Sequence, residues 1–135
     1  MTKKVFVSYD HSEDVHYKEL LRAWDANTDF DFEFNLRSPN VAIDSADASV
    51  IQAALTKKMK ESEYVLFIIG EKSYSSKWMK WESNRAQQDD TKLKFAAVRI
   101  KSGNTLPSGL PNYTSITNGF TLRGIIEALN KAKNN

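Results

Sequence analysis

Apolar positions along this chain follow two patterns: short runs, and longer segments in which they recur every three or four residues. The short runs predict β-strands and the longer segments predict amphipathic helices, because these spacings place apolar side chains on one face. Strands are expected at residues 3–8, 30–34, 64–69 and 95–100, with a brief fifth near 115–117. Helices are expected at about 15–26, 47–62, from 76 onward and at 120–133. This alternation predicts an α/β fold with an open, doubly wound parallel sheet.

Two of these strands differ in their polarity. Tyr64–Ile69 is almost entirely apolar, which is typical of a central strand in a parallel sheet covered on both faces. Phe30–Phe34 instead alternates phenylalanine with acidic residues, so one side of that strand is polar. We therefore expect Tyr64–Ile69 near the centre of the sheet and Phe30–Phe34 at an edge.

Length and composition are those of one ordinary globular domain, which we expect to span residues 1–135. No apolar run approaches the roughly 20 residues of a membrane span. The N-terminal segment has neither the apolar stretch nor the small-residue cleavage site of a secretory signal. A cytoplasmic location and no membrane partner are therefore predicted.

Residue counts argue against several kinds of chemistry. The chain has no cysteine and only two histidines, His11 and His16, so disulfides, thiol catalysis and a metal site are not expected. The glycines form neither a GxGxxG nor a GxxxxGK[ST] pattern, which argues against a Rossmann dehydrogenase or a P-loop ATPase. The net charge is +2 and the lysines are scattered among acids, so no nucleic-acid partner is expected.

In a doubly wound sheet, ligands bind outside the carboxyl ends of the strands, near the point where strand order reverses. Three loops are expected to converge there, at residues 8–11, 36–38 and 74–82. A response-regulator receiver would need an aspartate at the end of the third strand, where this chain has Gly70 and Glu71. Residues 101–117 form a further loop whose unusual length is typical of a functional segment.

The first two loops carry polar residues with ordinary explanations. Asp10, His11 and Ser12 are adjacent in sequence, so they cannot easily adopt the geometry of a hydrolase triad. Asp10 and Glu13 have the spacing of a helix capping box, which we take as the better account of that loop. Arg37 in the second loop is equally compatible with phosphate binding and with a solvated surface position.

The third loop leads into Ser76–Glu82, the most informative segment of the chain. Trp78 and Glu82 are four residues apart, so in a helix they share a face, and Glu82 points back toward the loop. An aromatic ring can stack on a planar cationic leaving group, and a neighbouring carboxylate can stabilise a sugar cation. From spacing alone, Glu82 is more often a surface residue that compensates the helix dipole, and Trp78 and Trp81 suit the core equally well.

Three stretches of the chain resemble the TIR domain, namely Val5–Tyr9, Ser62–Ile69 and Ser76–Glu82. TIR domains usually carry S-x-W-C-x-x-E in the last stretch, and here Met79 replaces the cysteine. The chain is particularly similar to the bacterial TIR-like branch associated with Thoeris-type antiphage defence. Residues 37–40 depart from the R-D-x-x-P-G-like stretch of many TIR domains. The resemblance implies a flavodoxin-like sheet of about five strands with flanking helices.

Catalytic TIR domains cleave NAD between nicotinamide and ribose, and the resemblance implies that Glu82 is the essential glutamate. NAD is then a substrate, and no separate cofactor is expected. Nicotinamide leaves as a neutral molecule, so one carboxylate that binds the ribose hydroxyls and stabilises an oxocarbenium-like transition state suffices. The residues expected to line the pocket with Glu82 are Trp78, Ser8, Tyr9, Asp10 and Ser75.

The nucleophile that attacks the ribosyl cation decides the product. Water gives linear ADP-ribose, whereas an adenine nitrogen or a ribose hydroxyl gives a cyclic isomer, which the Thoeris-like resemblance favours. It also implies self-association through TIR contacts and a downstream effector that senses the cyclic product. The alternative is a non-catalytic TIR-like module that signals by assembling with other chains, because one fold can serve both roles. Intact Trp78 and Glu82 favour the enzyme.

Overall fold

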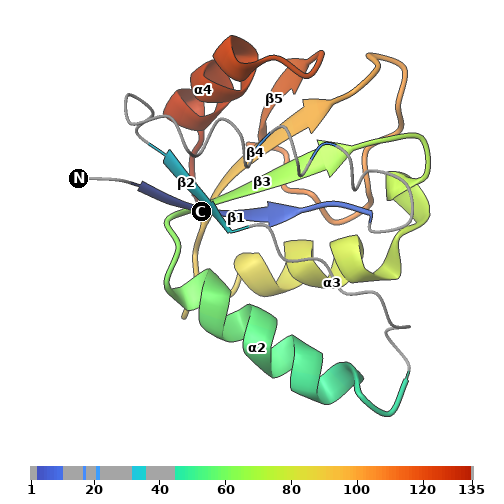
Figure 1. The fold of residues 1–135 in the computed structure, drawn as a ribbon, viewed down its shortest axis with the longest axis vertical. Helices are drawn as coiled ribbons and strands as arrows, with labels where there is room; N and C mark the ends of the chain where they lie inside the picture. Colours follow the sequence, from blue (N-terminus) through green and yellow to red (C-terminus); the bar gives the residue numbers. More distant parts are fainter. Residues whose placement is uncertain (1–2, 11–16, 18–20, 22–31, 36–44, 135) are drawn as a thin grey trace.

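The computed structural model describes residues 3–10, 17, 21, 32–35 and 45–134 (Figure 1). The named elements, in chain order, are β1 (Lys3–Ser8), β2 (Phe32–Asn35), α2 (Ala48–Lys60), β3 (Tyr64–Ile69), the 3-10 turn η1 (Ser73–Ser75), α3 (Lys77–Ala86), β4 (Lys94–Arg99), β5 (Ser115–Asn118) and α4 (Leu122–Lys131). Most of the first predicted helix lies outside the described residues, although Tyr17 and Leu21 are helical. None of the helices described here is long and apolar enough to cross a membrane.

The five strands form one parallel sheet in the order β2-β1-β3-β4-β5. After β1 the chain adds β2 on one side, and it then returns to the other side of β1 to add β3, β4 and β5. Strand order therefore reverses between β1 and β3, where Ser8 lies in register with Phe67. The predicted doubly wound parallel sheet is confirmed, and the fold is of the flavodoxin-like α/β type.

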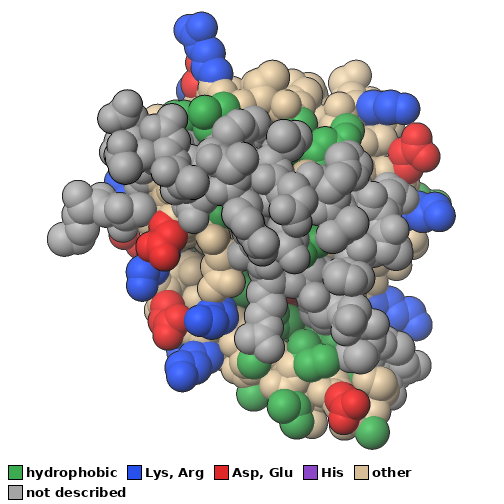
Figure 2. Space-filling view, viewed as in Figure 1, with side chains coloured by type: hydrophobic (Ala, Val, Ile, Leu, Met, Phe, Trp, Pro, Cys, Tyr) green, Lys and Arg blue, Asp and Glu red, His purple; other side chains and the backbone are tan. Residues whose placement is uncertain are grey.

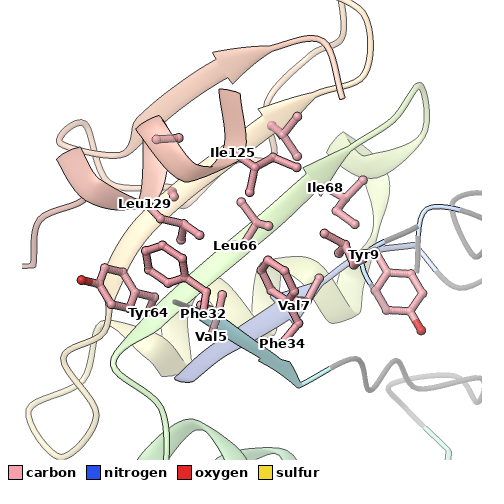
Figure 3. Packing of buried hydrophobic residues seen from close by; sticks show 14 residues of the cluster. Val5, Val7, Tyr9, Phe32, Phe34, Tyr64, Leu66, Ile68, Ile125 and Leu129 are labelled. Carbon is pink, nitrogen blue, oxygen red and sulfur yellow. The ribbon is translucent and has the colours of Figure 1, made fainter. Parts of the chain in front are cut away.

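Helices cover both faces of the sheet, with α4 on one face and α2 and α3 on the other (Figure 1). The side chains of β3 alternate between two buried clusters, so Leu66 and Ile68 pack toward α4 while Val65 and Phe67 pack toward α2 and α3. Figure 3 shows the first cluster, in which Ile125 and Leu129 of α4 meet the sheet. All six residues of β3 are buried, which confirms the prediction of a central strand covered on both sides.

The two edges of the sheet differ. In β2, Phe32 and Phe34 are buried and Glu33 between them is exposed, as expected for an edge strand with one polar side. The Phe32 ring meets Tyr64 edge to face at a centroid distance of 5.6 Å. The opposite edge is β5, whose Ile116 remains partly exposed.

The last helix begins two residues later than its apolar spacing predicts. Thr121 is extended, and its hydroxyl accepts a hydrogen bond from the Gly124 N–H at 3.1 Å. This side chain satisfies one of the amide groups that a helix leaves free at its start, so α4 begins at Leu122 and not at Phe120. The strands β4 and β5 lie within one residue of their predicted bounds.

The loop between β4 and β5 packs against α3. The carbonyl oxygen of Gly109 accepts hydrogen bonds from the Ser83 hydroxyl at 2.9 Å and from the Gln87 amide at 2.8 Å. Gly109 has φ +96°, a left-handed conformation that glycine adopts with little strain. Three apolar side chains of the loop join the cluster beneath α2 and α3: Leu106, Leu110 and Tyr113. The unusual length of this loop thus serves at least to hold α3 against the sheet.

Candidate active site

The start of α3 is set by Ser76, which is extended and whose hydroxyl accepts a hydrogen bond from the Met79 N–H at 3.2 Å. Glu82 lies about one and a half turns into this helix. Helical side chains tilt toward the N-terminus, so Glu82 points back toward the carboxyl end of the sheet. This direction agrees with the prediction from the spacing.

Glu82 meets Ser8 at the switch point of the sheet. The Ser8 hydroxyl donates a hydrogen bond of 2.6 Å to Oε1 of Glu82, joining residues 74 positions apart in the chain. Ser8 is the last residue of β1 and is fully buried, while Glu82 is 1% exposed. Among the residues that the structure describes, Oε2 of Glu82 has no hydrogen-bond partner. A buried carboxyl oxygen without a partner is costly for the fold and therefore calls for an explanation.

Burial raises the pKa of Glu82 from its ordinary 4.5 to about 8, and the hydrogen bond from Ser8 opposes that rise. The cause is desolvation, which disfavours the charged carboxylate more than the neutral acid. No described lysine or arginine forms an ion pair with Glu82 to offset this loss. A carboxyl with so displaced a pKa, at the ligand-binding edge of an α/β sheet, marks a candidate functional site.

The loop between β3 and α3 is held by its own hydrogen bonds. The buried hydroxyl of Ser73 accepts from the Gly70 N–H at 2.8 Å and lies 3.3 Å from the Ile68 carbonyl oxygen, to which it donates. Asn104, from the loop after β4, donates to the Ile69 carbonyl oxygen at 2.9 Å. These contacts fix the end of β3 beside the candidate site. Neither Ser73 nor Asn104 lies in a recognisable sequence motif, so no local signal could have identified them.

Trp78 and Trp81 lie on neighbouring turns of α3 and contact each other edge to face at a centroid distance of 5.8 Å. Both rings are partly buried and pack against the same apolar cluster. Met79, where most TIR domains have cysteine, is fully buried in that cluster. The structure gives both tryptophans a packing role, so the assignment of Trp78 to the pocket stays a prediction.

The remaining predicted pocket residues lie in different surroundings. Tyr9 is buried in the cluster under α4, on the opposite face of the sheet from α3 (Figure 3). Asp10 is partly exposed just beyond β1. Ser75 is exposed in η1, and its hydroxyl donates to the Lys72 carbonyl oxygen at 2.9 Å.

Of the predicted site residues, the structure thus brings Ser8 and Glu82 into direct contact. Residues 36–38, the second predicted loop, lie outside the described residues.

Charged groups of both signs surround these elements. On the face shown in Figure 2, the lysines and arginines drawn in colour are interspersed with aspartates and glutamates. Within the described ranges, no group of three or more histidine, aspartate or glutamate side chains is arranged to hold a metal ion. The titratable group that the structure places at the switch point of the sheet is the buried carboxyl of Glu82.

A parallel sheet with strand order 2-1-3-4-5 is common to flavodoxin-like α/β domains, and the helix after its third strand carries Glu82, the glutamate on which the TIR resemblance rests. The family model described as "Thoeris protein ThsB, TIR-like domain" matches residues 6–105, most of the chain. The chain therefore belongs to this family of TIR-like domains of antiphage defence. A search of the curated proteins found no match to the chain. The matched segment contains both Ser8 and Glu82.

Proposed function

We propose that this protein cleaves NAD at the bond between nicotinamide and ribose, and that Glu82 is the catalytic carboxylate. The observation that carries the proposal is the buried Glu82, held by Ser8 at the switch point, with Oε2 lacking a partner among the described residues. Evolution rarely retains an underpaired buried carboxyl for stability, since an apolar residue would fold better there. A functional role explains a glutamate at this buried position.

The chemistry needs one well-placed negative charge. The glycosidic C–N bond breaks with its electron pair passing to nicotinamide, which leaves as a neutral molecule, and positive charge develops on the ribose. An ionised Glu82 stabilises that charge and accepts hydrogen bonds from the ribose hydroxyls. The nicotinamide ring of NAD is itself cationic, so its arrival beside Glu82 lowers the pKa of the carboxyl and favours the ionised form.

Trp78 is proposed to stack on a ring of the nucleotide, at a gain of about 0.5–2 kcal/mol if that ring is the cationic nicotinamide. Its position one turn before Glu82 on α3 supports this role. Tyr9, Asp10 and Ser75 are retained as proposed pocket residues only through the TIR resemblance. Tyr9 is buried in the cluster under α4, and the Ser75 hydroxyl donates to the Lys72 carbonyl oxygen.

We further propose that the product is a cyclic isomer of ADP-ribose that acts as a defence signal on a separate effector. The Thoeris-type TIR-like family supports this proposal, and a site that excludes water from the ribosyl cation lets a nucleophile within the same molecule attack it. That nucleophile, an adenine nitrogen or a ribose hydroxyl, forms the new bond to the ribose carbon and releases any displaced proton to solvent. Self-association through TIR contacts completes this proposal.

The decisive experiment incubates the purified protein with NAD and identifies the products by mass spectrometry, with a parallel extract from phage-challenged cells. Nicotinamide should appear together with a species of ADP-ribose mass minus one water. Glu82→Gln keeps the shape of the side chain but removes its charge, and should lower the rate at least about a hundredfold. Asp90→Asn is the matched control, because Asp90 is an exposed carboxylate near the far end of α3, and its rate should be unchanged.

Each alternative outcome has a definite meaning. Linear ADP-ribose alone, under both conditions, refutes the cyclic product and leaves simple NAD hydrolysis. Activity of Glu82→Gln within a few-fold of the parent refutes the catalytic assignment. No NAD consumption by the parent under either condition favours the non-catalytic interaction module.

A further inference from the structure

The contact between Ser8 and Glu82 joins two rigid elements. Ser8 ends β1, which is paired on both sides, with β2 and with β3. Glu82 lies on α3, which is capped by Ser76 at its start and held by the Gly109 carbonyl oxygen farther along. The 2.6 Å hydrogen bond between them is therefore supported from both ends. Sites built on strands and helices in this way keep their geometry more closely than sites on loops.

The direction of this hydrogen bond restricts what Ser8 can do. Its hydroxyl has one proton, and that proton is donated to Oε1 of Glu82. With this proton engaged by Glu82, the Ser8 hydroxyl has none left to donate to a substrate. A nucleophilic serine would need a base to take its proton, and a carboxyl whose pKa is raised by burial is already protonated over much of the neutral range.

We propose that Ser8 is a positioning residue, which holds Oε1 of Glu82 so that Oε2 is the oxygen presented to the ribose. This inference rests on the proposed NAD cleavage. It replaces the direct substrate contact that the sequence predicted for Ser8. No covalent step occurs at Ser8, and its hydroxyl keeps its proton throughout. The hydrogen bond does two things, because it fixes the plane of the carboxyl and favours its charged form.

Ser8→Thr and Ser8→Val form the matched test, since the two side chains have nearly the same shape and differ in the hydroxyl. Ser8→Ala removes the hydroxyl without adding volume at this fully buried position. Thermal melts establish that each variant is folded before it is compared. The first readout is a carbon-13 NMR titration of the Glu82 carboxyl, assigned by its disappearance in Glu82→Gln. The second is the pH profile of NAD cleavage.

The pKa of Glu82 is expected to rise in Ser8→Ala, and to be higher in Ser8→Val than in Ser8→Thr, because the lost hydrogen bond favoured the ionised form. The acidic limb of the pH profile should move upward with it. We expect kcat to fall about tenfold to a hundredfold with little change in KM, and Ser8→Thr to recover part of the loss. A purely structural serine would lower the melting temperature without moving either titration.

Two results would overturn the inference. The first is an unchanged Glu82 titration in both Ser8→Ala and Ser8→Val, which shows that the hydroxyl does not act on the carboxyl. The second is equal kcat in the threonine and valine variants, which shows that the hydroxyl is irrelevant to turnover. If the parent cleaves no NAD, the proposed function fails separately, and the NMR titration still decides whether Ser8 holds Glu82.

Discussion

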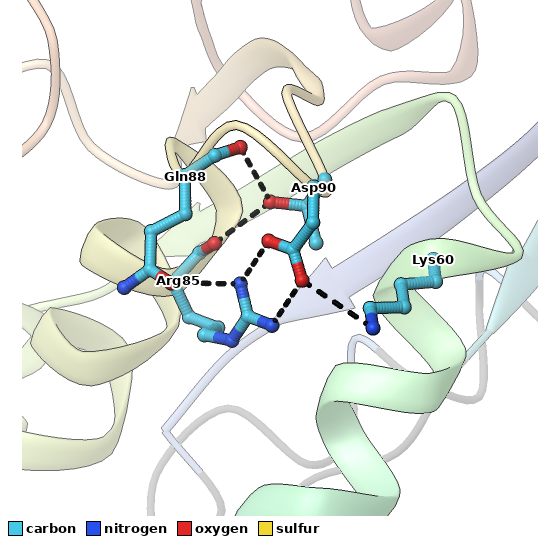
Figure 4. Close-up of polar contacts among 5 residues, drawn as sticks. Lys60, Arg85, Gln88 and Asp90 are labelled. Carbon is cyan, nitrogen blue, oxygen red and sulfur yellow. Dashed lines mark hydrogen bonds and ion pairs between the residues drawn. The ribbon is translucent and has the colours of Figure 1, made fainter.

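Two carboxylates near α3 lie in opposite surroundings. Glu82 is buried, has the neutral hydroxyl of Ser8 as its hydrogen-bond donor, and its pKa is raised to about 8. Asp90 follows the helix on the surface, where Arg85 donates two hydrogen bonds of 2.7 Å and Lys60 lies 3.3 Å away (Figure 4). The hydrogen bonds from Arg85, more than any other cause, lower the pKa of Asp90.

The contrast separates a carboxylate in an ordinary surface ion pair from a candidate functional one. Asp90 links α2 to the turn after α3. Its negative charge is paired with cations in contact with solvent, so its ionised form is stabilised. Glu82 is neither solvated nor matched by a described cation, so ionising it is unfavourable until a positive ligand arrives. The raised pKa of Glu82, together with an Oε2 atom that has no partner among the described residues, is therefore more informative about function than the lowered pKa of Asp90.

The largest effect expected is on the pH dependence of stability. The pKa of Glu82 is raised in the folded state, so its protonation stabilises the fold fully below pH 4.5. This contribution declines as the pH rises from 4.5 and is lost above about 8. At about 1.4 kcal/mol per pH unit, the decline is at most about 5 kcal/mol.

Urea unfolding of the parent and of Glu82→Gln, from pH 5 to pH 9, measures this decline as the difference between the two curves. Asp90→Asn serves as the control and should keep the slope of the parent over that range. Parallel curves for the parent and Glu82→Gln would show that Glu82 ionises in the folded protein as readily as in water.

The next effect concerns the two tryptophans, which share one apolar cluster. Trp78→Ala and Trp81→Ala should each lower the free energy of unfolding by about 2–4 kcal/mol, because each removes a partly buried indole ring and leaves a cavity in its place. Only the Trp78 variants should also lose NAD turnover per folded molecule, with phenylalanine retaining more than alanine because it keeps a stacking face.

Chemical denaturation and initial rates, normalised to the folded fraction, separate the two roles. If turnover per folded molecule is unchanged in both Trp78 variants, Trp78 belongs to the core in the same way as Trp81.

A smaller effect is expected at Gly109, whose carbonyl oxygen joins the loop after β4 to α3 by hydrogen bonds. Gly109→Ala places a Cβ at φ +96° and 3.3 Å from Oδ1 of Asn84, so we expect a loss of about 1–2 kcal/mol. Gly103→Ala is the matched control, because nothing described lies within 4 Å of its added Cβ and its φ is not positive. Hydrogen exchange of the α3 amides should be faster in Gly109→Ala and unchanged in the control. Equal protection in both variants would show that the conformation of Gly109 contributes nothing to the stability of α3.

The smallest effect is expected at Asp90, whose ion pairs are screened by water and salt. Its pKa is lowered in the folded state, so its contribution is present above its ordinary value of 3.8 and is lost as the pH falls. Asp90→Asn should therefore lower the melting temperature slightly at neutral pH, and less so in 1 M salt. A loss comparable to that of the tryptophan variants would contradict the assignment of Asp90 to the screened surface.

Much of the fold could be predicted because apolar spacing carries it directly. The continuous run at Tyr64–Ile69 identified the central strand, and the alternation around Phe32 and Phe34 identified an edge. Local spacing also placed Glu82 on a helix, on the same face as Trp78. These features depend on residues close together in sequence, which a periodic pattern can report.

The remainder depends on partners far apart in the chain. The hydrogen bond between Ser8 and Glu82 spans 74 positions, and it exists because β1 and β3 are neighbours in the sheet. Periodicity does not encode strand order, so it could indicate that both residues lie near the site but not that they touch. The hydrogen bond from Ser83 to the Gly109 carbonyl oxygen could not be predicted for the same reason, since the sequence shows only a glycine in a loop.

The strand order also has a consequence for protein synthesis. β1 is made before the other described strands, yet one of its two neighbours in the sheet is β3, which is made after β2 and α2. Ser8 must wait for a residue 74 positions later before its hydroxyl finds an acceptor. Under the proposed function, a nascent chain or one cut short before α3 cannot consume NAD. The site is therefore assembled only when the chain through α3 has been translated and folded.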